Sequence, residues 1–181
     1  MISTLDHLII VVKDLDEAEK DYTKIFGMSP VWRGEHKELG TINSIFNLEN
    51  TYFELLASKG AGLGADLVSS ALEQDGEGLT GIVFGTDNIK DAHASIKSAG
   101  YGIGEISNGE GSNSDNVNIR RWQNLFLPPE LTRGLFSFVI EHTDGQLPAS
   151  NYQTSSISKL DHVVINTNAV SYTHLTLPTK A

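Results

Sequence analysis

The stretch LDHLIIVVKDLDEAEKDYTKIFG, residues 5–27, predicts a β-strand followed directly by an α-helix. The apolar, largely β-branched run at residues 5–12 is typical of a strand. Asp14 is a favourable N-cap, apolar residues then recur at helical spacing, and Gly27 supplies a C-terminal stop. Three further extended stretches follow, separated by residues with turn chemistry, which gives the order βαβββ. These stretches are Ser29–His36, Thr41–Leu48 and Tyr52–Ala57.

The same order of elements returns in the second half of the chain. Ala92 takes the place of Ala18 on the second predicted helix, which Gly100 ends. A short linking helix is expected between the two halves, and the polar, glycine-rich stretch NGEGSNSDN is expected to be a mobile loop. The strands predicted here are Leu79–Thr86, Tyr101–Ser107, Val117–Leu127 and Leu135–His142; the linking helix is Ala65–Gln74 and the loop is Asn108–Asn116.

Composition excludes several classes of function. The chain of 181 residues has 13 Lys and Arg against 23 Asp and Glu, a formal net charge of −10 that argues against nucleic acid as a partner. It has no cysteine, so any metal must be held by His and carboxylates. The N-terminus lacks the features of a signal peptide, and no apolar run approaches the roughly 18 residues of a membrane span. We therefore expect a soluble, cytoplasmic protein with no membrane partner.

A third copy of the opening strand begins near the end of the chain. The residues from Lys159 to Ile165 repeat those from Thr4 to Ile10 almost one for one, after a linker rich in Pro, Ser, Thr and Gln. The residues after Ala169 resemble the translation of an adapter used to prepare sequencing libraries, so we do not expect them to belong to the fold. The predicted division is a domain at 1–145 with modules 1–76 and 77–145, a linker at 146–158, the first strand of a truncated second domain at 159–169, and an adapter-derived tail at 170–181.

The paired βαβββ modules, the Leu-Asp-His opening strand and a Glu in the fourth strand resemble the vicinal oxygen chelate superfamily, which includes glyoxalase I, extradiol dioxygenases and bleomycin-resistance proteins. The run from His36 to Asn43, followed by Tyr52-Phe-Glu-Leu-Leu, is similar to its glyoxalase-like domain subfamily. The resemblance covers about Leu5 to His142. It implies an α+β fold in which the two modules form one cup-shaped mixed sheet around a metal or ligand.

The resemblance also implies metal ligands on the first and fourth strands of each module. His7, Glu54 and Glu141 match such positions, while the alignment of Ala18 with Ala92 puts Gly81, which has no ligating side chain, at the place of His7. From the residues alone, His7 could instead be structural and Glu54 could pair with an arginine. Glu141 and His142 point to opposite faces of their strand, so either could be the one directed inward.

Five further residues are candidates for substrate binding. Thr41 and Asn43 alternate onto one strand face near His36, although turn and edge chemistry explains them equally well. Arg120 and Trp122 share a face with Asn124 and Phe126; directed inward, Arg120 would anchor a carboxylate, and directed outward it would be a solvated charge. The glycine-rich stretch at residues 60–65 fits a loose dinucleotide pattern, but the βαβββ repeat accounts for it better, so no nucleotide is expected.

The leading functional hypothesis is a metal-dependent enzyme that acts on a small oxygen-bearing substrate, of the lyase, isomerase or ring-cleaving dioxygenase type. A divalent ion, Zn, Fe, Mn or Ni, would act as a Lewis acid. The alternative is a non-catalytic ligand-binding or resistance module, or the metal-free N-terminal half of a two-domain dioxygenase-like protein. A homodimer is a further expectation from the resemblance.

Overall fold

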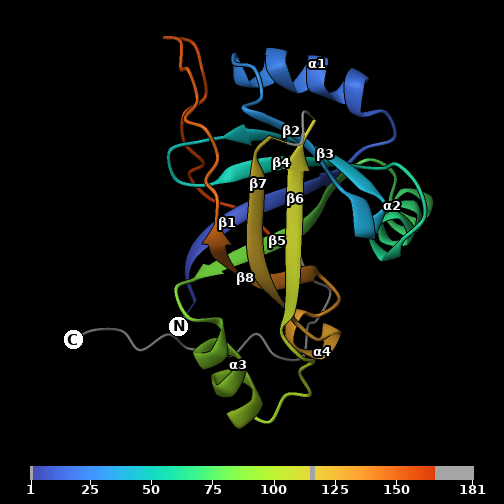
Figure 1. Cartoon of the computed structure of the whole chain (residues 1–181), viewed down its shortest axis with the longest axis vertical. Helices are drawn as coiled ribbons and strands as arrows, with labels where there is room; N and C mark the ends of the chain where they lie inside the picture. The colour runs from blue at the N-terminus through green and yellow to red at the C-terminus, as the bar shows by residue number, and fades with distance from the viewer. Residues whose placement is uncertain (1, 115–116, 166–181) are drawn as a thin grey trace.

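The computed structural model describes residues 2–114 and 117–165, in which eight strands form one mixed sheet that closes on itself as a barrel (Figure 1). The strand order is β1-β4-β3-β2-β6-β7-β8-β5, so each half of the chain supplies four neighbouring strands. The predicted α+β fold of paired βαβββ modules is thereby confirmed. The strands are β1 (Ile2–Val11), β2 (Trp32–His36), β3 (Thr41–Asn47), β4 (Tyr52–Ser58), β5 (Gly78–Thr86), β6 (Ser107–Asn113), β7 (Ile119–Phe126) and β8 (Phe136–Asp144).

In the described part of the chain, four α-helices and a 3₁₀ turn surround the barrel, with α1 at one end of the view in Figure 1 and α3 and α4 at the other. Asp14 caps α1 by accepting hydrogen bonds from the backbone of its first turn, and Gly27 ends it in the left-handed conformation, as the sequence predicts. No helix among the described residues is long and apolar enough to cross a membrane. The elements are α1 (Leu15–Phe26), η1 (Lys37–Leu39), α2 (Leu63–Gln74), α3 (Ile89–Ser98) and α4 (Pro129–Thr132).

Strands β1 and β5 join the two halves through an antiparallel pairing with near-twofold symmetry. His7 lies opposite Val83 and Ile9 lies opposite Gly81, on either side of the Leu8–Ile82 pair. The alignment of the two predicted helices matches His7 with Gly81 and Ile9 with Val83. A twofold axis through the Leu8–Ile82 pair relates the same residues, so the alignment agrees with the observed register. Gly81 is therefore the structural counterpart of His7.

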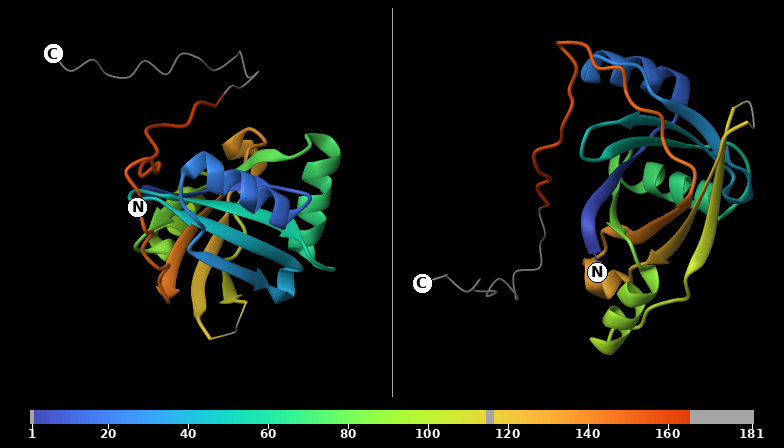
Figure 2. Two further views of the ribbon diagram at one scale, coloured as in Figure 1. Left: turned by 90° about the horizontal axis from the view of Figure 1, so that it is seen from above. Right: turned by 60° about the vertical axis from the view of Figure 1, so that its left-hand side comes forward.

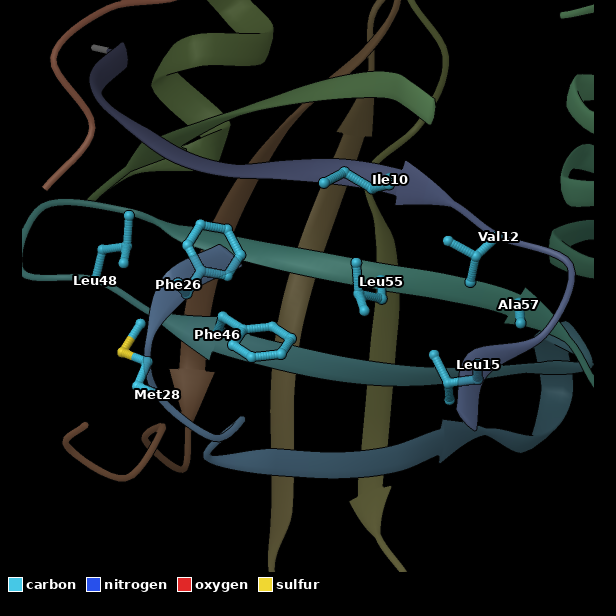
Figure 3. Close-up of a cluster of buried hydrophobic side chains, with 9 residues drawn as sticks. All are labelled: Ile10, Val12, Leu15, Phe26, Met28, Phe46, Leu48, Leu55 and Ala57. Atoms are coloured by element: carbon cyan, nitrogen blue, oxygen red, sulfur yellow. The ribbon is translucent and has the colours of Figure 1, made fainter. Parts of the chain in front are cut away.

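The largest core cluster lies between α1 and the outer face of the first half-sheet (Figure 3). Alternate residues of β1, β3 and β4 point toward the helix, because successive side chains of a strand face opposite sides of the sheet. Phe46 is fully buried there and its ring contacts Phe26 of α1 at a centroid distance of 5.1 Å. This outward packing leaves the other face of the same strands free to line the barrel.

Helix α3 packs on the second half in the equivalent way, through Ile89 and Ala92 against β7 and β8. Helix α2 packs on a different face of the sheet: its Val68 contacts side chains that face the barrel interior, such as Ile9 and Leu56. One end of the barrel interior is therefore filled by apolar side chains, which confines the polar side chains of the interior to the rest of the cup.

Residues 108–113 of the stretch expected to be a mobile loop belong instead to strand β6, and the strand expected at Tyr101–Ser107 is irregular up to its last residue. Pairing with β2 on one side and β7 on the other gives the polar sequence of β6 its backbone hydrogen bonds, which outweighs its low strand propensity. Its glycines have a steric role: a Cβ on Gly109 would overlap the indole of Trp122.

The segment after β8 runs back along the α1 side of the barrel (Figure 2). Ile157 donates a backbone hydrogen bond to Phe26, and Asn50 exchanges hydrogen bonds in both directions with Leu160. The predicted linker is thus attached to the first half of the domain. Residues 159–165 form no strand, and the remainder of the segment predicted to begin a second domain, together with the tail at 170–181, lies outside the described residues.

Replacing Phe46 with Ala should destabilise the protein by about 3–5 kcal/mol, because it leaves a cavity at the centre of the α1 cluster. The free energy of unfolding from urea titration measures the effect. Ile25→Ala, on an exposed part of α1, is the control and should change stability by less than about 0.5 kcal/mol. Equal losses in the two variants would contradict the assignment of this cluster as the core.

Candidate functional site

The interior of the barrel contains a cavity of about 1190 Å³, lined by both polar and aromatic side chains. All five residues predicted to bind substrate line it, as do two of the three predicted metal ligands. The polar group comes mainly from the first half of the chain, and the aromatic group mainly from the second. The predicted residues at the cavity are His7, His36, Thr41, Asn43, Glu54, Arg120 and Trp122.

His7 is buried between two carboxylates. Its Nδ1 lies 2.7 Å from Asp6 Oδ1 and its Nε2 lies 3.4 Å from Glu54 Oε2, while its ring stacks on Tyr52 at a centroid distance of 4.4 Å. Burial alone would lower the pKa of His7, but hydrogen bonds to both carboxylates outweigh it and raise the pKa above its ordinary value. This imidazole is therefore stabilised in its cationic form.

Glu54 connects His7 to a second histidine. Asn43 Nδ2 donates a hydrogen bond to Glu54 Oε1 at 2.7 Å, and His36 Nε2 lies 4.0 Å from the same oxygen. Burial would raise the pKa of Glu54, but its hydrogen bond with His7 and the charges around it lower it to about 2. Glu54 thus remains ionised although it is buried, because cations and donors surround it.

His36 has the opposite character to His7. Its Nδ1 lies 3.0 Å from the hydroxyl oxygen of Thr41, and its ring meets Trp122 edge to face at a centroid distance of 5.6 Å. Burial lowers the pKa of His36, and the positive charges of Arg120 and His7 lower it further against the attraction of Glu54. The cavity therefore holds one histidine favoured as a cation and one favoured as a neutral base.

Asp6 extends this network to a third histidine, His142. His142 Nε2 lies 3.2 Å from Asp6 Oδ2, so the carboxylate sits between two histidines. Burial would raise the pKa of Asp6, but the hydrogen bonds with His142 and His7 hold it well below its ordinary value. Of the two alternatives left open on β8, His142 is the residue that lines the cavity.

Glu141 is placed differently from the prediction. Its Oε2 accepts a hydrogen bond from the backbone N–H of Ile89 at 2.8 Å, so the carboxylate lies at the first turn of α3 on the outer face of the sheet. The register shows which residue of β8 corresponds to Glu54. Ile9 pairs with Glu54 and its symmetry counterpart Val83 pairs with Phe138, which makes Phe138 the equivalent position.

Both positions of the second half that correspond to His7 and Glu54 thus carry residues that cannot bind a metal. A Cβ on Gly81 would lie 2.9 Å from the ring of Phe136 and 3.3 Å from Ile9, which places this glycine on the inner face beneath an aromatic ring. Phe138 occupies the position of the fourth-strand carboxylate. The wall on this side of the cup is consequently apolar.

The donor set does not match the metal site expected from the resemblance. Among residues 2–114 and 117–165, no group of three or more His, Asp or Glu side chains is arranged to hold a metal ion. His7 and Glu54 are the two predicted ligands that converge.

Two βαβββ halves that share one cup, with a histidine on the first strand and a glutamate on the fourth facing its interior, define a protein of the vicinal oxygen chelate superfamily. The glyoxalase-like domain family model matches residues 5–179. The chain belongs to this family. The match extends into the segment predicted to be a tail, which lies outside the described residues.

Solved structures share the fold at low sequence identity. Methylmalonyl-CoA epimerase from Streptomyces coelicolor, in complex with 2-nitronate-propionyl-CoA, is 21% identical with a TM-score of 0.61, over 78% of this chain and 98% of that one. The epimerase from Mycobacterium tuberculosis is 18% identical with a TM-score of 0.61, over 79% and 90%. A hypothetical protein from Bacillus halodurans is 16% identical with a TM-score of 0.62, over 80% and 98%. No curated protein matches this chain.

Several residues of the site were not among the candidates drawn from the sequence. Asp6 had a signal, because the Asp-His pair recurs at Asp161 and His162, where the two side chains also lie 2.6 Å apart. Tyr52 shares a strand face with Glu54, which could have indicated it. Trp32, whose ring lies 5.7 Å from the Arg120 guanidinium, carried no signal, because β2 and β7 are far apart in sequence.

Glu54→Gln should destabilise the protein by on the order of 2 kcal/mol near neutral pH, because His7 then loses a buried counter-charge. The ordinary pKa of Glu54 is 4.5 and the folded protein holds it at about 2. This stabilisation is complete above pH 4.5 and is lost as the pH falls toward 2, so the stability difference from wild type should shrink over that interval. Unfolding free energies from pH 2 to 7 measure it.

The exposed position Glu73 on α2 supplies the matched control, since Glu73→Gln also removes one negative charge. A difference between wild type and Glu54→Gln that stays constant from pH 7 to pH 2 would contradict the pairing of Glu54 with His7.

Proposed function

We propose that this protein is a small-molecule enzyme that transfers a proton at a carbon next to an oxygen function, a reaction of the isomerase or lyase type. The observation that carries the proposal is the pair of histidines in one cavity, His7 and His36, whose pKa values are shifted in opposite directions. Groups whose environments separate their pKa values in this way divide the roles of acid and base. Structural neighbours solved with acyl-CoA ligands support a small-molecule substrate.

In this proposal, His36 is the base. An Nδ1–H donated to Thr41 leaves the lone pair of Nε2 available, and Nε2 is directed to the Asn43 and Glu54 side of the cavity. This nitrogen takes the proton from the substrate carbon and returns it in the reverse step.

His7 stabilises the oxygen on which negative charge develops. Its Nε2 lies 3.4 Å from Glu54, a distance long enough for a substrate oxygen to become a second acceptor of the same N–H. Asp6 holds the other ring nitrogen at 2.7 Å and keeps the imidazole oriented and cationic. A cation fixed in a buried site before the reaction stabilises a developing anion without reorganisation.

Divalent-metal dependence is the further expectation that the resemblance implies, and the donor set does not support it. A lasting loss of activity on chelation, restored by Zn, Fe(II), Mn or Ni, would favour the metal-dependent hypothesis over the one proposed.

The second candidate function is ligand binding without chemistry, as in resistance modules or the metal-free half of a two-domain dioxygenase-like protein. Gly81 and Phe138 favour it, because two of the four symmetry-related positions of the cup carry no ligating side chain. Stoichiometric ligand binding without proton exchange would support this candidate and contradict an enzyme.

Exchange of substrate hydrogens with D₂O, followed by proton NMR, tests the enzyme directly. The panel contains methylmalonyl-CoA, 2-oxo acids and 1,2-dicarbonyl compounds, with enzyme that has been treated with a chelator. His36→Gln should lower the exchange rate by about 10²–10⁴-fold, because it removes the base. His93→Gln on α3, outside the cavity, should leave the rate unchanged. Full exchange in His36→Gln would show that another group is the base.

A further inference from the structure

The cavity has a charged end and an apolar end, with His7 between them. The guanidinium of Arg120 lies 5.7 Å from the ring of Tyr52, and that ring stacks on His7 at 4.4 Å. On its other side His7 meets Phe138 edge to face at 5.9 Å. Phe138 contacts Phe126 at 5.2 Å. These contacts form one row of side chains along the cavity.

Arg120 has the properties of an anion anchor that lacks its anion. The residue is 7% exposed, its Nε has no hydrogen-bond partner, and no carboxylate of the described residues forms an ion pair with it. The rings of Trp32 and Tyr52 flank the guanidinium, and the Tyr52 side chain also hydrogen-bonds with it, which holds the group in place while its Nε stays unpaired. A buried guanidinium needs a counter-charge, and a carboxylate suits its forked geometry.

Asn124, four residues along β7 from Arg120, supplies a second unsatisfied group in the cavity. It follows Arg120 and Trp122 on the same face of β7, it lines the cavity, and its buried Oδ1 has no partner among the described residues. A polar atom left unpaired in a buried site costs free energy that a ligand can recover by hydrogen bonding. The inner face of β7 therefore carries two unsatisfied polar side chains, Arg120 at the charged end and Asn124 between Trp122 and Phe126.

The opposite end is formed by three phenylalanines, the phenylalanine wall. The rings of Phe126, Phe136 and Phe138 contact one another at centroid distances of 5.2–6.2 Å, and all three line the cavity. Phe126 remains 49% exposed although it faces this site, so apolar surface is available for a ligand to bury. Phe138 occupies the position equivalent to Glu54, and Phe136 lies over Gly81, the position equivalent to His7.

We propose that the cavity binds a small carboxylic acid with an aromatic-sized apolar tail, its carboxylate on Arg120 and its tail on the phenylalanine wall. The carbon and oxygen next to the carboxylate then lie near His7. The inference names the substrate class for the function proposed above, and it rests on that function only for the reaction at His7. Binding itself requires no turnover.

Calorimetric titration with three related compounds tests the inference. Phenylpyruvate has the carboxylate and the ring; phenylacetone replaces the carboxylate with a methyl group, and pyruvate lacks the ring. Wild-type protein should bind phenylpyruvate about tenfold or more tightly than either of the others. Equal binding of phenylacetone and phenylpyruvate, or no binding of phenylpyruvate at millimolar concentration, would overturn the inference.

Arg120→Gln should remove the preference for phenylpyruvate over phenylacetone. Arg121→Gln is the matched control, since Arg121 is the next residue and is engaged by Glu110 and Asp144. It should preserve the preference, and the same loss in both variants would overturn the assignment. Phe126→Ala, at a half-exposed position compatible with folding, should weaken phenylpyruvate and leave pyruvate unchanged.

His36→Gln separates this inference from the proposed enzyme. It should lower the rate of proton exchange by about 10²–10⁴-fold and retain the preference for phenylpyruvate. If wild-type protein binds phenylpyruvate with the expected preference but catalyses no exchange on any compound of the panel, the substrate class stands and the proposed reaction fails. If exchange occurs without any preference for the carboxylate, the reaction stands and the anchor fails.

Discussion

The antiparallel pairing of β1 with β5 is the constraint on which the rest of the structure depends. It closes the barrel by joining two half-sheets that the chain builds separately, and its register sets which side chains face inward at the centre of the cup. With His7 opposite Val83, the inner face of β1 presents the imidazole beside Ile9 and Gly81. A slip of one residue would direct His7 outward, because side chains alternate along a strand. The fold and the site are therefore fixed by the same hydrogen-bond ladder.

Within that frame, the buried charges are arranged so that each has a partner. Glu54 is ionised in the interior because His7 is cationic and Asn43 donates to it, and His7 is cationic because Asp6 faces its other nitrogen. Removing one member leaves an uncompensated charge, so the network is cooperative. His36 lies just beyond it, 4.0 Å from Glu54, where burial and then the charges of Arg120 and His7 lower its pKa.

Much of this arrangement could be predicted from sequence. Periodicity and caps indicated both modules and their helices, and strand alternation grouped Thr41 with Asn43 and Arg120 with Trp122, all of which line the cavity. These are local properties of the chain. Strand β6 could not be predicted, because its stability comes from two neighbouring strands and not from its own polar, glycine-rich sequence.

The assignment of Glu141 shows a different limit of prediction from sequence. A single offset in residue number relates the opening strands and the helices of the two modules. In the hydrogen-bonded sheet, Tyr52 lies opposite His7 and Phe136 lies opposite Gly81, so Phe136 corresponds to Tyr52. The fourth strands are thus separated by a longer interval than the helices, because the second module has additional residues before its last strand. Only the ladder of hydrogen bonds reveals this interval. From sequence, Glu141 is the acidic residue nearest the expected ligand position, but its carboxylate binds the first turn of a helix on the other face of the sheet.

A duplicated scaffold also explains why the two halves must differ for the site to act on one molecule in one way. Two equivalent halves would offer a ligand two orientations related by the twofold axis. With His7 and Glu54 in one half and Gly81 and Phe138 in the other, a ligand that carries both charge and apolar surface meets complementary groups in a single orientation. Proton transfer depends on such an orientation, because the base reaches one face of the reacting carbon. The loss of symmetry in the side chains, on a backbone that retains it, is what makes the cup suited to a directional reaction.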